Sequence, residues 1–342
     1  YAREFGITPR VRFRTRVTAV EPMPAGRWLL RLEDGSTEDV DAVVVATGHQ
    51  AEPSHPSFRD DFTGTYLHVH DYRVPEAFAG KRVLVVGTGN SAMDSAADLA
   101  GVAATVAVVA RSPVLIMPRM LFGVPTARVL ARVERPWMPW ALRRRLRVLL
   151  ATIVHGRMEK WGLTTPTTPT HPTGHATIMS HAAYGRVVFR PGITAVRGTE
   201  VEFADGRREE FDVMLAATGY EVDLPFLAPH VVPVVGRRVD LYKRIFPPGR
   251  PNLYFIGMFN VSGGANIRMM DTQSRLMAAV VAGEVVLPSV EAMRADVERE
   301  KRELRERYPD RPRYELELDP VVYRAEVAAL EAAATATEPP WR

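Results

Sequence analysis

No cysteine occurs among the 342 residues of the sequence. The chain therefore forms neither disulfides nor zinc–thiolate sites, and the absence of a C-x-x-C pair excludes a thiol-dependent disulfide reductase. Long hydrophobic runs are also missing, because no stretch reaches the roughly 18 apolar residues of a membrane-spanning helix. Neither sign of charge dominates: 44 Lys and Arg accompany 40 Asp and Glu, so the sequence does not predict nucleic-acid binding.

The length and the hydrophobic fraction of 46% are sufficient for two domains with buried cores, and we expect a cytoplasmic protein. The first residue is Tyr1 rather than Met, so we expect a chain truncated at its N-terminus. Val11, Phe13 and Val17 alternate with arginines, a pattern that predicts a first strand from Val11 to Val17.

A glycine-rich turn is the strongest local signal. It follows an apolar strand predicted for Lys81–Val86 and precedes a helix and a second strand, Thr105–Ala110. This β-α-β order predicts an α/β fold with a parallel sheet and helices on both of its faces. Within the turn, Gly87 permits a tight bend, Gly89 permits close approach of a pyrophosphate, and Ala92 permits close packing of the helix.

The two ends of this unit indicate the ligand. Asn90 and Ser91 begin the helix, where free N–H groups and the partial positive charge of the helix favour a phosphate. The second strand ends in Arg111-Ser112, where an NAD site would carry Asp or Glu for the ribose 2′-hydroxyl. A guanidinium and a hydroxyl suit a 2′-phosphate, so the sequence predicts NADPH rather than NADH.

Two further buried strands end in one small-residue pattern, Ala46-Thr47-Gly48 and Ala217-Thr218-Gly219. Small residues at a strand end leave space for backbone beside a bound dinucleotide. Because the two strings flank the glycine-rich turn, they indicate strands that leave and re-enter a second dinucleotide-binding domain.

The segment Phe62-x-Gly64-x-x-x-His68-x-x-x-Tyr72 is similar to the fingerprint of flavin-containing monooxygenases, whereas the related Baeyer–Villiger enzymes usually carry Trp at its last position. Further matches occur in the order of the family: Gly87-x-Gly89-Asn90-Ser91-Ala92, Arg111-Ser112-Pro113, Ala217-Thr218-Gly219-Tyr220, Tyr254-Phe255-Ile256-Gly257 and Asp271-x-Gln273-x-Arg275. The sequence resembles this family, including its plant auxin-forming and bacterial members, from residue 1 to about residue 325.

The resemblance implies two Rossmann-like dinucleotide-binding domains, one inserted into the other. We expect a discontinuous FAD-binding domain at 1–79 and 212–342. It would be incomplete at its N-terminus, because the glycine fingerprint for the FAD pyrophosphate would precede residue 1. We expect the NADPH-binding domain at 80–211, with a basic helical excursion at 126–161 packed over it.

The resemblance also implies the chemistry. NADPH reduces FAD, and the reduced flavin and O2 form a C4a-hydroperoxide that oxygenates a small organic substrate at nitrogen, sulfur or a carbonyl-adjacent carbon. Because the flavin carries this chemistry, no side chain is expected to be catalytic.

Residue roles follow from the same resemblance. The implied NADPH-binding residues are Gly87, Gly89, Asn90, Ser91, Ala92, Arg111, Ser112, Thr218 and Gly219. The implied FAD-binding residues are Val17, Thr47, Gly48, Gly257 and Gln273. In the motif of Phe62, Gly64, His68 and Tyr72, the last two are expected to brace the domain junction rather than to perform chemistry.

Two alternative functions stay open: a Baeyer–Villiger monooxygenase, and a non-catalytic NADPH-binding fragment that lacks the FAD pyrophosphate motif. His171, His175 and His181 lack the spacing of metal ligands, so no metal is expected. The Trp- and Arg-rich run from Trp137 to Arg147 is compatible with a membrane surface, but a packed helical excursion is the favoured interpretation. The sequence identifies neither the substrate nor the oligomeric state.

Overall fold

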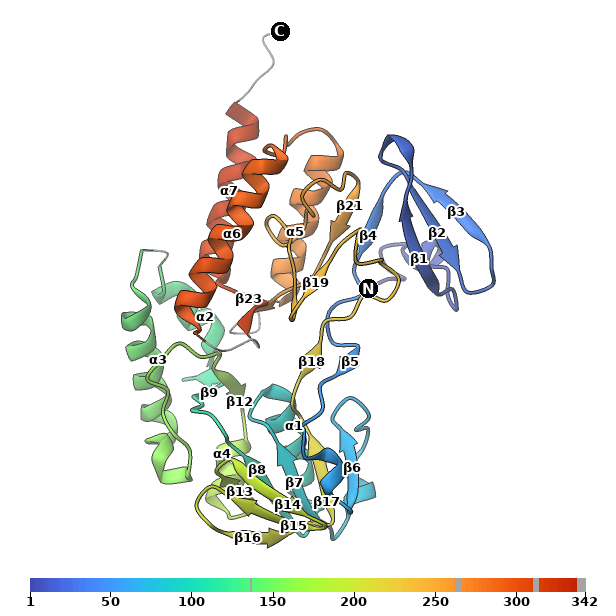
Figure 1. The fold of residues 1–342 in the computed structure, drawn as a ribbon. Coiled ribbons are helices and arrows are strands. Elements are labelled where there is room, and N and C mark those ends of the chain that lie inside the picture. The colour runs from blue at the N-terminus through green and yellow to red at the C-terminus, as the bar shows by residue number, and fades with distance from the viewer. Residues whose placement is uncertain (136, 262–265, 310–313, 337–342) are drawn as a thin grey trace.

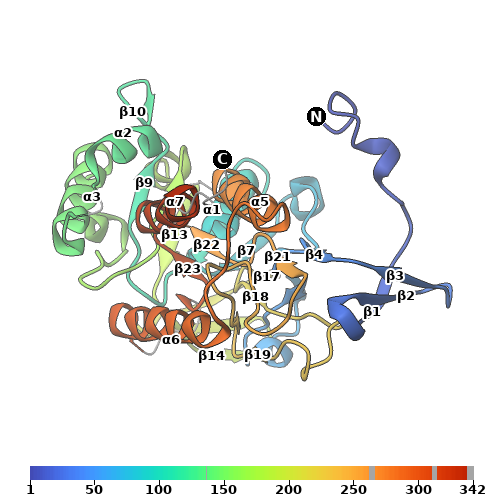
Figure 2. The same ribbon diagram turned by 90° about the horizontal axis from the view of Figure 1, so that it is seen from above.

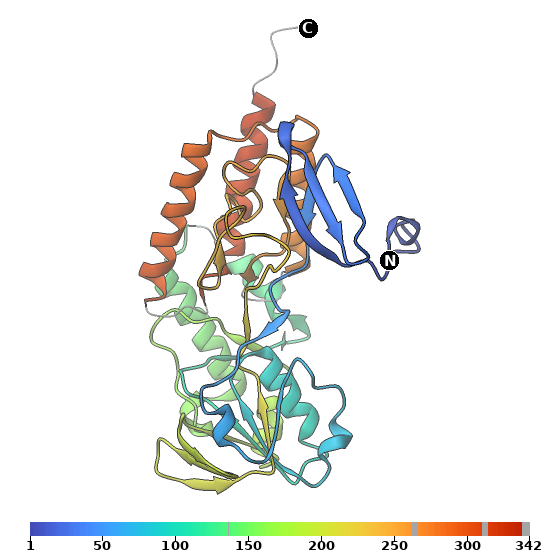
Figure 3. The same cartoon turned by 45° about the vertical axis from the view of Figure 1, so that its right-hand side comes forward.

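The computed structural model describes residues 1–135, 137–261, 266–309 and 314–336, which form two lobes (Figure 1). The lower lobe comprises residues 54–219, and the upper lobe comprises the segments on either side of it. The chain enters the lower lobe through β5 (Glu52–Pro53) and leaves it through β18 (Tyr220–Glu221). These two strands pair antiparallel and form the connector between the lobes (Figure 3).

A five-stranded parallel sheet in the order β13-β8-β7-β17-β6 is the centre of the lower lobe. Its strands are β6 (Thr65–His68), β7 (Arg82–Val86), β8 (Thr105–Val109), β13 (Val187–Arg190) and β17 (Val213–Ala216). The interior strands β7 and β17 consist almost entirely of apolar residues, because a parallel strand of this kind is buried on both faces.

Two different layers cover this sheet, because successive side chains of a strand point to opposite faces. Val85 packs against α1 (Asn90–Leu99), which shares its apolar cluster with α4 (Ile178–Ala183). Leu84 points the other way and packs with Phe203 of a small antiparallel sheet. The predicted helices therefore cover one face only, and the prediction is wrong for the other. That sheet consists of β14 (Ile193–Arg197), β15 (Glu200–Phe203) and β16 (Arg208–Glu210).

The upper lobe combines an antiparallel sheet, a parallel strand pair and long helices. The sheet has the order β1-β2-β3, and β4 pairs parallel with β21. The elements are β1 (Val17–Pro22), β2 (Trp28–Leu32), β3 (Thr37–Val40), β4 (Val43–Val45), β21 (Leu253–Phe255), α5 (Asn266–Val281), α6 (Val290–Arg307) and α7 (Pro320–Ala336). Trp28 is buried and its indole N–H donates to the carbonyl of Pro251 (3.1 Å), which fixes the sheet to the strand pair.

The remaining strands and helices complete the fold. They are β9 (Ile116–Pro118), β10 (Met120–Leu121), β11 (Val124–Pro125), α2 (Thr126–Val133), α3 (Trp140–His155), β12 (Thr173–His175), β19 (Val234–Val235), β20 (Arg238–Val239), β22 (Asn260–Val261) and β23 (Glu317–Leu318). Seen from above, α2, α3 and the β10–β11 hairpin lie at the rim of the molecule opposite the β1–β3 sheet (Figure 2).

The sheet corrects the predicted domain limits. The boundaries 79/80 and 211/212 assign β6 and β17 to a different domain from β7, yet β17 is hydrogen-bonded to both β6 and β7. The change of lobe occurs instead at the connector of β5 and β18, outside both strands.

The predicted first strand is also wrong. Residues 11–16 belong to no strand, Arg14 has a φ of +54°, and the strand begins only at Val17. Phe13 is 69% exposed, so the alternation of apolar and basic residues in this segment does not correspond to a buried face.

We expect the Gly64→Ala substitution to destabilise the lower lobe by about 1–3 kcal/mol, because overpacking a close contact forces neighbouring atoms to move. A Cβ at Gly64 would lie 2.7 Å from the Phe62 ring and 2.8 Å from the Asp212 carbonyl oxygen. Gly101→Ala is the matched control, since no described atom lies within 4 Å of its Cβ position and its φ is not positive. Urea unfolding measures both, and equal stabilities would contradict the prediction.

Candidate functional site

The candidate site lies where three parallel strands end. The turn that begins at Gly87 follows β7, Arg111 follows β8, and Thr218 follows β17. Because β8, β7 and β17 are neighbours and parallel, these three segments meet at one edge of the sheet. The crevice outside the carboxyl ends of parallel strands is the usual ligand position in such sheets.

Gly87 and Gly89 have different roles in this turn. Gly87 has a φ of +133°, and a Cβ there would collide with the carbonyl oxygen of Ala217. The neighbouring strand therefore requires glycine at position 87 whether or not a ligand is bound. At Gly89 the backbone is extended and no described atom lies within 4 Å of the Cβ position. The missing side chain leaves this space open to a ligand.

The first turn of α1 supplies the hydrogen-bond donors. The helix begins at Asn90, Gly89 is its N-cap residue, and no described side chain accepts a capping hydrogen bond there. Asn90 and Ser91 are exposed, whereas Ala92 is fully buried against the sheet. Ala92 thus permits close helix packing and does not reach a ligand. Free N–H groups beside open space fit a dinucleotide pyrophosphate, so the residues present suit the cofactor predicted from the sequence.

Sequence reasoning missed a second segment at this turn. The strand pair of β9 and β12 brings Thr173 to the loop, where its hydroxyl donates to the carbonyl of Thr88 (2.7 Å). The N–H of Gly174 donates to the side-chain oxygen of Asn90 (3.2 Å). The second contact ties the Asn90 side chain to β12. No local residue pattern predicts these contacts, because Asn90 and Gly174 are 84 positions apart in the chain.

An ion-pair network adjoins the same helix end. Asp94 of α1 accepts from Arg119 (3.1 Å) and contacts the Nε2 of His175 (3.1 Å). The Nδ1 of His175 accepts N–H bonds from Thr177 and Ile178, so its proton is on Nε2, which donates to Asp94. Burial lowers the pKa of His175, which favours this neutral form.

Arg111 and Ser112 lie at the predicted position for the 2′-phosphate. Both are exposed and lie just beyond β8, which ends at Val109. The Cβ position of Gly192 lies 3.4 Å from the Cγ of Arg111, so the neighbouring loop supports the stem of this side chain. The cation is therefore positioned at the strand end while its head group faces solvent.

Thr218 and Gly219 lie at the same edge but belong equally to the connector. The hydroxyl of Thr218 donates to the carbonyl of Ser54, and the N–H of Ser54 donates to the carbonyl of Gly219 (2.9 Å). Ser54 in turn donates to Glu221 (2.6 Å). Through Ser54, this edge of the nucleotide site is attached to the strands that join the two lobes.

The residues predicted for FAD gather at a second strand edge. Thr47 and Gly48 follow β4, and Gly257 follows β21, which is the parallel neighbour of β4. Gln273 is fully buried, and its amide accepts from the N–H of Gly257 (2.9 Å) and donates to the carbonyl of Arg244 (3.2 Å). Gln273 therefore holds the Gly257 turn in place and does not point at a ligand.

Val17 is separate from this edge. It begins β1 and packs against the apolar cluster that also contains Val45 and Phe255 of the strand pair. Its side chain therefore supports the apolar wall of the upper lobe.

The four motif residues lie in the lower lobe. Phe62 is buried and packs next to Gly64, whereas His68 ends β6 and stacks edge-on against Tyr220 of the connector, with ring centroids 5.2 Å apart. Burial lowers the pKa of His68, so its imidazole is neutral at the lobe junction. Tyr72 differs from expectation: its hydroxyl donates to Asp98 of α1 (2.6 Å), so it braces the lower lobe and not the junction.

The remaining histidines do not converge. His171 contacts Glu317 (3.1 Å) on a different element from Asp94, the partner of His175. Among the described residues, no group of three or more His, Cys, Asp and Glu side chains could hold a metal ion. Within the residues that the structure describes, no helix has the length and apolar character needed to cross a membrane.

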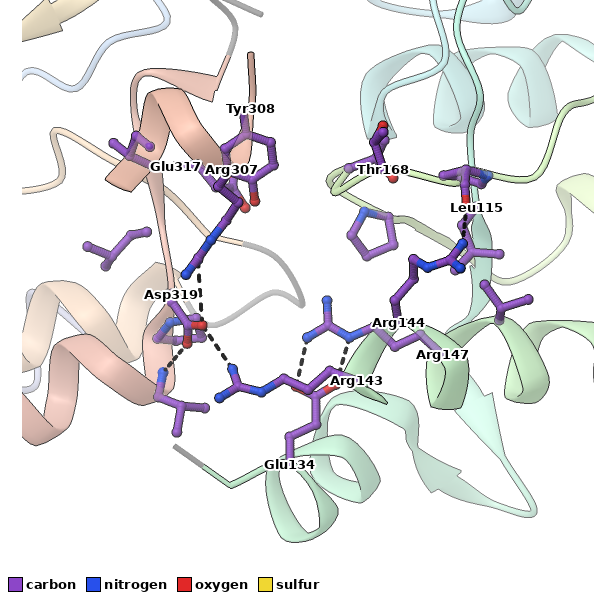
Figure 4. Close-up of a pocket in the computed structure, with 18 residues that line it drawn as sticks. Leu115, Glu134, Arg143, Arg144, Arg147, Thr168, Arg307, Tyr308, Glu317 and Asp319 are labelled. Atoms are coloured by element: carbon purple, nitrogen blue, oxygen red, sulfur yellow. Dashed lines mark hydrogen bonds and ion pairs between the residues drawn. The ribbon is translucent and has the colours of Figure 1, made fainter. Parts of the chain in front are cut away.

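A cavity of about 70 Å³ lies elsewhere, between α3 and the C-terminal segment (Figure 4). Arg143 pairs with Asp319 (2.9 Å), and Arg147 makes two contacts with Glu134 (2.6 and 2.7 Å). Burial raises the pKa of Tyr308 in its wall. These arginines are bound to carboxylates of the chain itself, so the cavity is the contact between the excursion and the upper lobe.

Comparison with known proteins identifies relatives. The sequence matches the family described as flavin-binding monooxygenase-like over residues 1–336. It is 33% identical to flavin-containing monooxygenase 5 of Cavia porcellus over 96% of this chain and 65% of that protein. The chain thus spans slightly less than two thirds of the length of that relative.

Solved structures share the fold. S-allyl-L-cysteine S-oxygenase from Allium sativum is similar with a TM-score of 0.70 and 25% identity, over 97% of this chain and 64% of that chain. Cyclohexanone monooxygenase from Rhodococcus sp. Phi1, solved bound to NADP+, is similar with a TM-score of 0.67 and 16% identity, over 97% and 81%.

The two glycines of the turn should respond differently to alanine. Gly89→Ala is expected to leave the unfolding midpoint unchanged and to weaken NADPH binding about tenfold or more, because the new methyl group occupies open space at the helix end. Gly87→Ala is expected to lower the unfolding midpoint, because of its clash with Ala217. Calorimetric titration with NADPH and thermal unfolding test both. Undiminished NADPH affinity in the Gly89 variant would refute this assignment of the site.

Proposed function

Since this chain belongs to the flavin-binding monooxygenase-like family, we propose that it is the NADPH-binding part and a portion of the FAD-binding part of a flavoprotein monooxygenase. The observation that supports this most strongly is the open first turn of α1 at Gly89, between the strand ends that carry Arg111 and Thr218. Dinucleotide phosphates bind at such a place in parallel sheets.

In the proposed NADPH site, each group has a distinct task. Gly89 admits the pyrophosphate, and the N–H groups of Asn90 and Ser91 donate to it. Arg111 and Ser112 bind the 2′-phosphate that distinguishes NADPH from NADH. Thr218 and Gly219 close the other side of the edge and hold the connector in place.

The proposed FAD site uses the edge of β4 and β21. Thr47, Gly48 and Gly257 lie at the carboxyl ends of these strands, and Gly48 and Gly257 have φ values of +72° and +85°. Thr47, Gly48 and Gly257 would hold FAD at this edge, and the bound flavin would supply the redox chemistry with NADPH and O2 that oxygenates a small organic substrate. No side chain is assigned a catalytic role. The residues of this chain bind the two cofactors and hold the strand edges at a fixed relation through the connector.

We also propose a cytoplasmic protein with a small-molecule substrate and O2 as reactants. Tyr72 at the end of the motif favours oxygenation at nitrogen or sulfur over Baeyer–Villiger insertion, because the related ketone-oxidising enzymes usually carry Trp there. An assay with a thioether and one with a cyclic ketone, both with added FAD and with NADPH consumption as the readout, distinguish these two reactions. Sulfoxide supports the proposal, lactone favours the Baeyer–Villiger alternative, and NADPH binding without turnover favours a non-catalytic fragment.

Arg111→Ala should weaken NADPH binding about tenfold or more and change NADH binding less than about twofold, because only NADPH carries the 2′-phosphate. Arg197→Ala is the control, as this arginine of β14 is also exposed and pairs with Glu202 of the neighbouring strand β15. Fluorescence titration with both nucleotides gives the ratio. Equal losses for NADPH and NADH would exclude Arg111 as the 2′-phosphate ligand.

A further inference from the structure

The strand β12 contacts the glycine-rich turn although it belongs to a different sheet. Among the described strands it pairs only with β9. The hydroxyl of Thr173, which is buried, donates to the carbonyl of Thr88 (2.7 Å), and the N–H of the next residue, Gly174, donates to the side-chain oxygen of Asn90 (3.2 Å). Two successive residues of β12 therefore fix two positions of the turn from which α1 begins.

Glycines on both sides of Thr88 leave the backbone of this turn with few restraints of its own, because glycine has more accessible conformations than other residues. Close approach of β17 restrains the Gly87 side, since a Cβ there would collide with the carbonyl oxygen of Ala217. On the Gly89 side, no described atom lies within 4 Å of the Cβ position. The peptide group between Thr88 and Gly89 is therefore restrained from outside the turn, by the hydrogen bond of Thr173.

That hydrogen bond determines where the Gly89 N–H points. The peptide bond is trans, and in a trans peptide the C=O and N–H groups point in opposite directions. Because the Thr88 carbonyl is directed at Thr173, the N–H of Gly89 is directed away from β12. None of the described residues accepts a hydrogen bond from this N–H. It is a free donor beside the space that the missing Gly89 side chain leaves open.

The side chain of Asn90 supplies a second oriented donor. An amide oxygen accepts hydrogen bonds whereas the amide nitrogen donates them, so the Gly174 N–H takes the oxygen as its partner. The NH2 group of Asn90 is thereby turned away from Gly174 and is left for another acceptor. Asn90 itself is exposed at the start of α1. The strand β12 therefore orients one backbone donor and one side-chain donor at the same helix end.

His175 holds β12 in this position. Its Nε2 donates to Asp94 of α1 (3.1 Å), and its Nδ1 accepts two backbone N–H groups at the start of α4. Arg119 contacts Asp94 (3.1 Å) and also donates to the carbonyl of Gly174 (3.3 Å). A shift of β12 along α1 would break these contacts, and the burial of His175 makes their loss costly. The strand is thus a fixed support for the turn.

We propose that Thr173 is a positioning residue of the nucleotide site, whose hydroxyl aims the Gly89 N–H at the pyrophosphate of the bound dinucleotide. Gly174 positions the NH2 group of Asn90 for the same pyrophosphate. This inference rests on the proposed function, which places NADPH at this turn. Hydrogen bonds to the charged oxygens of a pyrophosphate are strong, and donors that are oriented before binding lose less entropy when the ligand binds. Thr173 acts through the peptide group that it holds and is assigned no contact with the dinucleotide.

Calorimetric titration of variants at position 173 tests whether the hydroxyl has this role. Thr173→Val and Thr173→Ala remove the hydroxyl and should each raise the NADPH dissociation constant of the purified chain about fivefold or more, because a hydrogen bond to a charged group is weakened. Thr173→Ser keeps the hydroxyl and should stay within about twofold of the unsubstituted chain. The dissociation constant for NADH should rise by the same factor as that for NADPH, because both nucleotides carry the pyrophosphate. That result differs from the NADPH-selective loss expected for Arg111→Ala.

Thr126→Val is the matched control, since Thr126 is also buried and its hydroxyl donates to the carbonyl of Pro118 (2.5 Å). It should lower the midpoint of thermal unfolding and leave the NADPH affinity unchanged. Unchanged affinity in whichever of Thr173→Val and Thr173→Ala is folded, or an equal loss in Thr173→Ser or in Thr126→Val, would overturn the role of Thr173 and leave the proposed function standing. An unsubstituted chain that does not bind NADPH would instead refute the proposed function, and this inference with it.

Discussion

Parallel alignment of β7 with β8 on one side and β17 on the other is the constraint on which the candidate site depends. Neighbouring parallel strands end at one edge, so the turn at Gly87, the cation of Arg111 and the hydroxyl of Thr218 are brought together although up to 131 residues separate them in the chain. Burial of the strands on both faces fixes this alignment. The contact between Gly87 and Ala217 shows how closely the strands approach at that edge.

The connector links this edge to the second one. Ser54 contacts Thr218, Gly219 and Glu221, and Arg237 of the upper lobe donates to both Ser54 (2.9 Å) and Glu221. Any shift of the lower lobe relative to the edge of β4 and β21 would therefore change the hydrogen bonds of this network. In the proposed function the two cofactors react with each other, so the position of one strand edge relative to the other decides whether hydride transfer is possible. The neutral His68, packed against Tyr220, belongs to the same junction.

The excursion shows a different balance of forces. Ion pairs from Arg143 and Arg147 attach α3 to the upper lobe and to α2, and the same orientation leaves Leu149 and Ile153 exposed. Exposure of large aliphatic groups costs free energy in water, whereas a buried carboxylate without its cation costs more. The fold therefore keeps the charged face of α3 inside and leaves the aliphatic side chains at the surface.

By itself the sequence determined the elements whose signal is local. The turn from Gly87 to Ala92, the strands on either side of it and the helix that it begins follow from the glycine positions and from the apolar pattern around them. Only the tertiary structure decided which strands are neighbours, and so moved the lobe boundary to β5 and β18. It also placed Tyr72 on Asp98 and the Thr173–His175 strand at the helix end. Those contacts join segments that are far apart in the chain, and local residue patterns do not predict which distant segments pack together.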